Sequence, residues 1–89
     1  MTVSDVRIRR TVQDGRLRAV VSITLDNCIA VHDIRLVQGD DRLFVAMPSR
    51  RDDEGRYRDI IHPINSDIRN QIEDRIIEAY QSIESASDI

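Results

Sequence analysis

Four arginines lie within nine residues of this chain, on both sides of an acidic turn. Arg50 and Arg51 precede the segment 52–55, Asp-Asp-Glu-Gly, and Arg56 and Arg58 follow it. Apolar runs flank the stretch, a pattern typical of a β-hairpin, in which Arg51 would lie opposite Arg56. Each guanidinium offers a planar fork of donors that fits phosphate oxygens. The stretch therefore predicts a phosphate-binding loop, although its three acidic residues oppose the same phosphates.

Tyr57 lies between two of these arginines, Arg56 and Arg58. A tyrosine in such a position can stack on a base of single-stranded RNA or DNA. The same side chain could instead cover the edge of the core, and the sequence leaves both interpretations open. Because the chain has only two tyrosines, one phenylalanine and no tryptophan, it favours phosphate contacts over readout of single-stranded bases by stacking.

A second arginine cluster is expected on a hairpin formed by residues 3–12 and 16–25 around Asp14-Gly15, a strong turn signal. Pairing Ile8 with Val21 collects most of the apolar residues on one face, because strand side chains alternate between faces. This pairing also places Val12 opposite Leu17 and Arg10 opposite Ala19. The opposite, polar face then holds four arginines: Arg7, Arg9, Arg16 and Arg18. They form either a secondary basic binding face or a merely solvated surface.

Residues 28–37 and 42–47 predict another hairpin, around a turn at 38–41. The pairs expected on its apolar face are Leu36 with Leu43, Ile34 with Val45, and His32 with Met47. The other face also carries apolar residues: Ile29, Val31, Val37, Phe44 and Ala46. Apolar residues on both faces indicate that both are covered. Since one helix covers only one face, we expect a second subunit, and hence a homodimer.

The C-terminal third predicts an amphipathic helix with Ser66 as its N-cap. The apolar stripe contains Ile68, Ile72, Ile76, Ala79, Tyr80 and Ile83, and the outward face contains Glu73, Asp74, Glu78 and Glu84 with Arg69 and Arg75. The predicted fold is α+β: a four- or five-stranded antiparallel sheet with this helix packed on one face. Residues 1–84 form a single domain, and residues 85–89 are expected to be a frayed tail.

Other chemistry finds little support in the sequence, and we expect no enzyme, cofactor, metal site or small-molecule substrate. His32 is expected as a hydrogen-bonded core residue, and His62 as a partner of the turn before the helix. Cys28 lies in an apolar run and is expected to be buried and inert. One cysteine excludes an internal disulfide and fits a reducing compartment. With two histidines at unsuitable spacing, it does not form a zinc site.

The charge distribution is uneven. Residues 1–58 hold 11 Arg against 9 acidic residues, a charge of +2, whereas residues 59–89 hold 2 Arg against 7, a charge of −5. The net charge of −3 is unlike that of a strongly basic nucleic-acid binder. No apolar stretch approaches the roughly 20 residues needed to cross a bilayer, so we expect no membrane insertion.

The order of several short motifs resembles the SpoVG family, the stage V sporulation protein G family of septation regulators. The motifs are Val-Ser-Asp-Val-Arg-Ile-Arg-Arg at 3–10, Asp-Gly-Arg at 14–16, residues 19–26, Val-His-Asp-Ile-Arg at 31–35, Phe-Val-Ala-Met-Pro-Ser at 44–49, Arg-Asp-Ile at 58–60 and His-Pro-Ile-Asn-Ser at 62–66. The resemblance implies a small cytoplasmic protein that binds DNA and RNA, forms dimers, and affects septation and gene expression. Arg50 and Arg51 match the basic pair of the family motif and Arg58 its later arginine, but the acids at 52–54 depart from the more basic family pattern.

A second class of function stays open: a protein-interaction module in cell division that uses strand edges and the acidic helix face without binding nucleic acid. Salt dependence separates the two classes, because phosphate binding weakens steeply as salt rises. The sequence does not choose between DNA and RNA, or identify a target sequence.

Overall fold

The computed structural model describes residues 1–87, with side chains through residue 83. Its strands are β1 (Val3–Asp14), β2 (Leu17–Leu25), β3 (Ile29–Gln38), β4 (Leu43–Ala46), β5 (Ser49–Arg51) and β6 (Tyr57–Asp59), and its helix is α1 (Ser66–Ser87). β1 to β4 form one antiparallel sheet in chain order, and β5 pairs with β6 in a separate two-stranded sheet. The α+β prediction is confirmed, with four strands in the main sheet.

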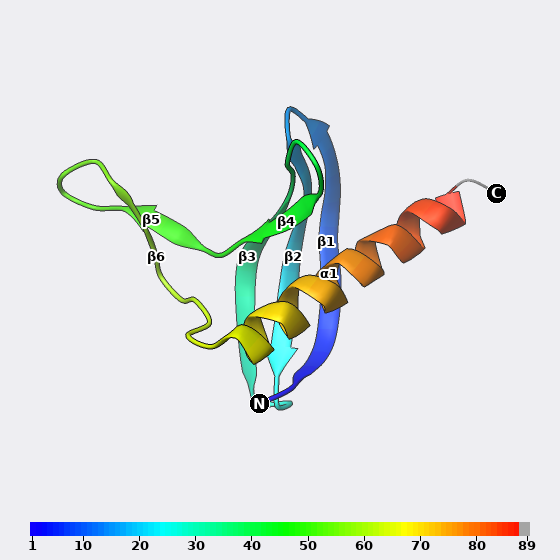
Figure 1. The fold of residues 1–89 in the computed structure, drawn as a ribbon, viewed down its shortest axis with the longest axis horizontal. Helices are drawn as coiled ribbons and strands as arrows, with labels where there is room; N and C mark the ends of the chain where they lie inside the picture. The colour runs from blue at the N-terminus through cyan, green and yellow to red at the C-terminus, as the bar shows by residue number, and fades with distance from the viewer. Residues whose placement is uncertain (88–89) are drawn as a thin grey trace.

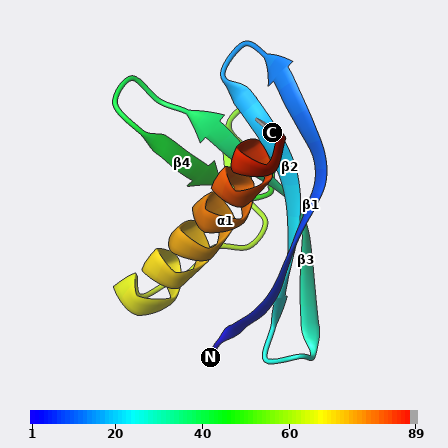
Figure 2. The ribbon, with the colours of Figure 1, turned by 90° about the vertical axis from the view of Figure 1, so that its right-hand side faces the viewer.

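Residues 49–59 project from the main sheet on the side of β4, and we call this hairpin the arm (Figure 1). The chain measures 47 × 32 × 22 Å along its principal axes. α1 crosses one face of the main sheet, whereas the opposite face, which we call the outer face, carries no helix of the described chain (Figure 2). The arm and the outer face therefore remain accessible.

The core lies between α1 and the inner face of the sheet. The alternation of apolar residues along β2 and the four-residue repeat on α1 bring the two apolar surfaces together. The buried residues are Val3, Ala19, Val21, Ile23, Leu25, Val31, Ile34, Leu36, Ile72, Ile76 and Tyr80. The predicted helix stripe is thus buried at its centre, while Ile83 near its end is 42% exposed.

The first hairpin has the predicted pair Ile8 with Val21, and Val6 pairs with Ile23 in the same register, but the register differs near the turn. Asp14 pairs with Leu17, so the turn is Gly15-Arg16, and Gly15 has a φ of 62°. Irregularities between Ile8 and Arg10, and between Thr11 and Asp14, absorb the difference. As a result, the predicted pairs of Val12 with Leu17 and Arg10 with Ala19 were wrong. Arg10 pairs with Val20 on the outer face.

The second hairpin is shifted by two residues from the predicted register. Leu36 pairs with Val45 and Gln38 with Leu43, because Gly39 begins the loop and donates its N–H to the Arg42 carbonyl at 2.8 Å. The predicted pairs Leu36 with Leu43 and Ile34 with Val45 were therefore wrong. A shift of two leaves each side chain on its predicted face, since strand side chains alternate with period two.

A bulge in β3 overturns the prediction for His32. Ile23 pairs with Val31 but Val21 pairs with Ile34, so β3 has one extra residue here, and Asp33 has a φ of 62°. An extra residue reverses the alternation. Val31, predicted on the mixed face, is buried, whereas His32 is exposed rather than in the core.

Two other local predictions were wrong. Cys28 is exposed, because it lies in the turn between β2 and β3, after two residues of positive φ, Asp26 and Asn27. Its thiol donates to the Asp26 carbonyl at 2.9 Å. The N-cap of α1 is Asn65 and not Ser66, since the Asn65 side-chain oxygen accepts the Ile68 N–H at 2.9 Å.

The described part of α1 includes residues 85–87, which were predicted to belong to a frayed tail, while 88–89 of that tail lie outside the described residues. The side chain of Glu84, predicted for the outward helix face, also lies outside the described side chains. Across residues 1–87, no helix is both long and apolar enough to cross a membrane.

Candidate nucleic-acid interface

The arm does not place its four arginines on one face. Arg50 pairs with Arg58, and Arg51 pairs with Tyr57 rather than with Arg56 as predicted. Paired residues point to the same side and successive residues to opposite sides. One face of the arm therefore carries Arg50 and Arg58, and the other carries Arg51 and Tyr57.

The turn of the arm is built on Asp52. Its Oδ1 accepts the backbone N–H groups of Glu54 and Arg56, each at 2.9 Å. Its Oδ2 accepts Arg58 Nε at 2.8 Å. The hydrogen bond from Arg58 lowers the pKa of the Asp52 carboxyl, and the N–H groups of Arg56 and Glu54 lower the pKa further, against a smaller opposing effect of desolvation. Asp52 therefore organises the turn and is already engaged by a cation.

The arginines of the arm differ in whether their side chains have a hydrogen-bond or ion-pair partner. Arg58 is bound to Asp52, and Arg56 Nε lies 4.0 Å from Glu54 Oε2. Arg50 and Arg51 have neither a hydrogen bond nor an ion pair from their side chains to any described residue, and both are exposed. Arg50 and Arg51 are thus the two arginines of the arm whose side chains have no partner among the described residues.

Tyr57 is 72% exposed, so it does not cover the edge of the core. Of the two interpretations that the sequence leaves open, the structure excludes this one. Tyr57 pairs with Arg51 across the two strands of the arm, so the same face of the arm carries a guanidinium and an aromatic ring.

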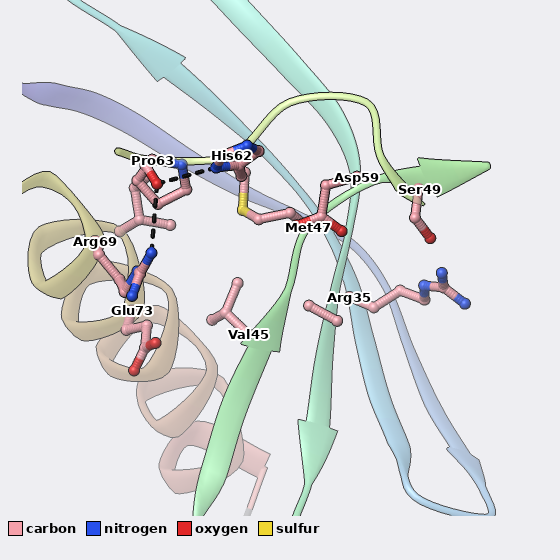
Figure 3. A pocket seen from close by; sticks show the side chains of 11 residues that line it. Arg35, Val45, Met47, Ser49, Asp59, His62, Pro63, Arg69 and Glu73 are labelled. Carbon is pink, nitrogen blue, oxygen red and sulfur yellow. Dashed lines mark hydrogen bonds between the residues drawn. The ribbon is translucent and has the colours of Figure 1, made fainter. Parts of the chain in front are cut away.

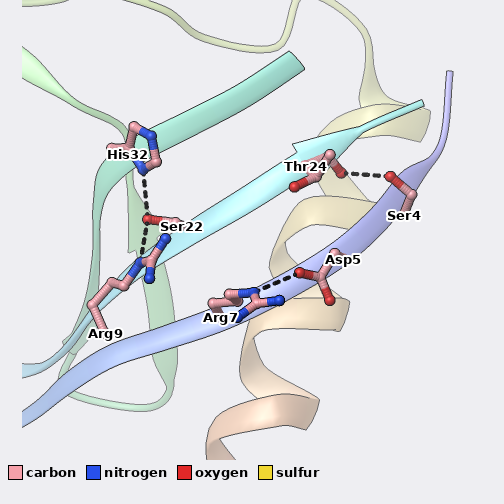
Figure 4. Close-up of polar contacts among 7 residues, drawn as sticks. All are labelled: Ser4, Asp5, Arg7, Arg9, Ser22, Thr24 and His32. Atoms are coloured by element: carbon pink, nitrogen blue, oxygen red, sulfur yellow. Dashed lines mark hydrogen bonds and ion pairs between the residues drawn. The ribbon is translucent and has the colours of Figure 1, made fainter. Parts of the chain in front are cut away.

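The arginines of the secondary basic face have hydrogen-bond or ion-pair partners within the chain. Arg7 pairs with Asp5 at 3.1 Å, and Arg9 donates to the Ser22 hydroxyl at 3.1 Å, which also lies 2.8 Å from His32 Nδ1 (Figure 4). Arg16 lies in the turn and pairs with Asp40 at 2.9 Å. Arg18 donates to the carbonyls of Gly15 and Leu17 at 2.9 and 3.3 Å.

Two arginines on the outer face were absent from the predicted clusters. Arg10 and Arg35 lie in one cross-strand row, on either side of Val20. Neither side chain has a hydrogen bond or ion pair to a described residue. The doublet Arg9-Arg10 was a usable signal, because two successive residues of a regular strand cannot both face outward. Arg35 was predicted on the face opposite Ile34 and Leu36, and the structure agrees, because both of these residues are buried.

The base of the arm rests on a polar hollow beside the start of α1, lined in part by Met47, Ser49, Asp59 and Glu73 (Figure 3). The Pro63 carbonyl lies 3.2 Å from His62 Nδ1 and accepts Arg69 Nη2 at 3.4 Å. The predicted role of His62 at this turn is confirmed. These contacts connect the segment after the arm to the first turns of the helix.

An apolar groove lies between the first turns of α1 and the adjoining ends of β2 and β3, and several large apolar side chains are exposed there. Its lining includes Met1 (70% exposed), Ile29 (50%), Ile61 (39%) and Ile64 (88%). Exposed apolar side chains that gather in this way mark contact surfaces more often than isolated ones do.

Comparison with known proteins identifies the family. The SpoVG family model matches residues 1–82 of the chain. The chain belongs to the SpoVG family. It is 48% identical over 88 residues to the "Putative septation protein SpoVG" of Caldicellulosiruptor saccharolyticus, a match that covers 99% of this chain and 100% of that protein.

Two staphylococcal proteins with the same name are also similar. The protein of Staphylococcus aureus strain MRSA252 is 51% identical over 84 residues, which are 94% of this chain and 84% of that protein. The protein of Staphylococcus carnosus is 54% identical over 80 residues, which are 90% of this chain and 75% of that protein. The resemblance inferred from the sequence motifs is therefore confirmed.

Proposed function

We propose that this SpoVG-family protein is a cytoplasmic, non-catalytic nucleic-acid-binding regulator with a role in septation. The proposed role in septation follows from the name of its relatives, which are called septation proteins. The cytoplasmic location follows the family resemblance, and one free cysteine fits a reducing compartment. The observation that carries the binding proposal is the state of Arg50 and Arg51, which are exposed on a projecting arm without a partner among the described residues.

Phosphate is the ligand group that suits these two side chains. A guanidinium stays charged at any working pH and binds phosphate oxygens through two parallel N–H groups. Such contacts give affinity and position without reading sequence. The acidic residues of the arm oppose binding less than their number indicates, because Asp52 accepts Arg58 and Glu54 lies near Arg56.

The test is a double variant, Arg50→Gln with Arg51→Gln, and the matched control Arg42→Gln. Arg42 is exposed, has no side-chain partner among the described residues, and lies in the loop between β3 and β4. Binding of labelled single-stranded and duplex DNA and of RNA is measured by fluorescence anisotropy between 50 and 200 mM KCl. Each lost phosphate contact lowers the salt slope by about 0.7 on single strands and about 0.9 on duplex DNA.

We therefore expect the double variant to lose about 1.4 to 1.8 of the salt slope, and the control to lose none. Equal binding by the double variant and the wild type, with both folded by circular dichroism, would remove the arm from the interface.

The apolar groove is a candidate surface for assembly of the protein. We propose that a second copy of the chain covers it, since a chain of 89 residues has a thin core and exposes Ile29 and Ile64 there. Ile64→Asp should convert a dimer into a monomer in light-scattering chromatography, whereas Ile83→Asp, on the exposed helix end, should not. A wild-type protein that is monomeric at high micromolar concentration contradicts the dimer. If it also binds no nucleic acid, the groove is left for a different protein.

A further inference from the structure

We infer that the outer face of the sheet continues the phosphate-binding surface of the arm, and that the two together bind single-stranded nucleic acid. In this arrangement Arg10 and Arg35 bind backbone phosphates on the sheet, and the strand passes Ile60 to reach Arg50. The inference rests on the proposed function, and it adds two binding residues and a class of nucleic acid.

The first support is the register. Arg10 pairs with Val20, and Val20 pairs with Arg35, so the three residues form a row across β1, β2 and β3. Paired residues share a face, and strands are about 4.8 Å apart, which separates the two arginine backbones by roughly 10 Å. The row lines a hollow on the outer face together with Asp33, Pro48 and Ile60.

The second support is that the two arginines are available. Four other arginines of the chain, Arg7, Arg16, Arg56 and Arg58, lie within 4.0 Å of a carboxylate. Arg10 and Arg35 do not, even though Asp33 lines the same hollow. The hollow therefore holds two cations against one anion, with Arg9 beside it on β1. This excess of positive charge occurs in a chain whose net charge is −3.

The third support is continuity. Ile60 is 64% exposed and lines both this hollow and the adjoining one on the arm, where Arg50 and Arg58 lie. Its N–H donates to the Pro48 carbonyl at 2.7 Å, which fixes it at the corner between the arm and the sheet. An exposed apolar side chain thus joins the hollow on the sheet to the hollow on the arm, whose lining has three arginines and three aspartates.

The change of direction between the sheet face and the arm bears on which class of nucleic acid can contact both. A ligand that contacts both sites must bend from the sheet face onto the projecting arm. Duplex DNA has a persistence length of about 150 base pairs and resists such a bend, whereas a single strand follows it. A single strand also exposes its bases to apolar and aromatic side chains such as Ile60 and Tyr57, and this combination with arginines is typical of single-strand binding.

The experiment compares Arg10→Gln with Arg35→Gln as a double variant, the arm double variant at Arg50 and Arg51, and Arg42→Gln as the control. The probes are labelled oligo-dT of 20 nucleotides, the corresponding oligo-U, and a 20-base-pair duplex. All are titrated between 50 and 200 mM KCl, and the melting temperature of each variant is measured.

We expect the outer-face variant to lose about 1.4 of the salt slope on both single strands, which is two phosphate contacts at about 0.7 each. Its slope on the duplex, and the behaviour of the control, should not change. The DNA and RNA probes distinguish the two sources of the same phosphate chemistry, and either one supports the inference.

Three results would overturn it. If the arm variant weakens binding and the outer-face variant does not, the proposed function stands and the inference fails. The inference also fails if the wild type binds the duplex alone. If the wild type binds none of the probes, the inference and the proposed function fail together.

Discussion

Asp52→Asn should strengthen nucleic-acid binding, because it releases Arg58. The side-chain oxygen of asparagine can still accept the N–H groups of Glu54 and Arg56, which the Asp52 Oδ1 accepts at 2.9 Å. The amide nitrogen that replaces Oδ2 cannot accept Arg58 Nε, whose bond at 2.8 Å is therefore lost. The turn is kept and one guanidinium becomes available, directly opposite Arg50.

The expected gain is one phosphate contact. The salt slope should rise by about 0.7 on single strands or about 0.9 on duplex DNA. Asp53→Asn is the matched control, since it makes the same change in charge one residue away. Asp53 is exposed and its side chain has no hydrogen bond or ion pair to a described residue. Any effect of net charge alone appears in both variants, and only the difference between them reports on Arg58.

Fluorescence anisotropy over a series of KCl concentrations measures both variants, with the melting temperature as a check on folding. Equal slopes for Asp52→Asn and Asp53→Asn would refute the reasoning, because Arg58 would then make no phosphate contact when released. Weaker binding by Asp52→Asn at an unchanged melting temperature would refute it as well. That result would mean that the Asp52–Arg58 ion pair holds the arm in its binding conformation.

Three further predictions concern the fold. Ile76→Val should lower the free energy of unfolding by about 1 kcal/mol and the melting temperature by roughly 4–8 °C, because Ile76 is fully buried. The control Ile83→Val, at a position that is 42% exposed, should change the free energy of unfolding by less than about 0.5 kcal/mol. Equal effects of the two substitutions would show that the end of α1 is covered. Asn65→Ala should cost about 1 kcal/mol as the loss of an N-cap, and Ser66→Ala only a few tenths, in urea unfolding; a larger cost at Ser66 would restore the cap expected from the sequence. The pKa of Asp52 is held below its ordinary value, so its ion pair with Arg58 is present at neutral pH and is lost only as the pH falls through that lowered pKa; in an NMR titration its carboxyl should have a midpoint below the ordinary value of an aspartate side chain, and a midpoint at or above that value would contradict the contacts at the turn.

Much of the fold follows from periodicity in the sequence. The alternation of apolar residues in β2 predicts the inner face correctly, and the repeat of Ile72, Ile76 and Tyr80 predicts the side of α1 that packs against it. These signals are strong because burial selects the same face over several turns or residue pairs.

The features that the sequence did not predict arise where a strand contains one extra residue. The bulge at Asp33 exposes His32 and buries Val31, and the irregularity after Ile8 turns Arg10 outward. Bulges depend on contacts with the neighbouring strand and leave little local pattern, apart from breaks such as the doublet Arg9-Arg10. The arm was predicted as a hairpin, but its pairing is shifted by one residue, so that Tyr57 rather than Arg56 lies opposite Arg51.

The separation of the arm from the core has an evolutionary consequence. The arm contributes none of the buried apolar residues of the core, and its turn is held by contacts made within residues 52–58. Substitutions there can change what is bound at little cost in folding stability, because exposed positions tolerate replacement. The charge of the arm, and with it the proposed binding, can therefore change while the main sheet and α1 stay the same. Replacing the acidic residues at 52–54 with a more basic turn on this same sheet would show how much of the proposed binding depends on the arm.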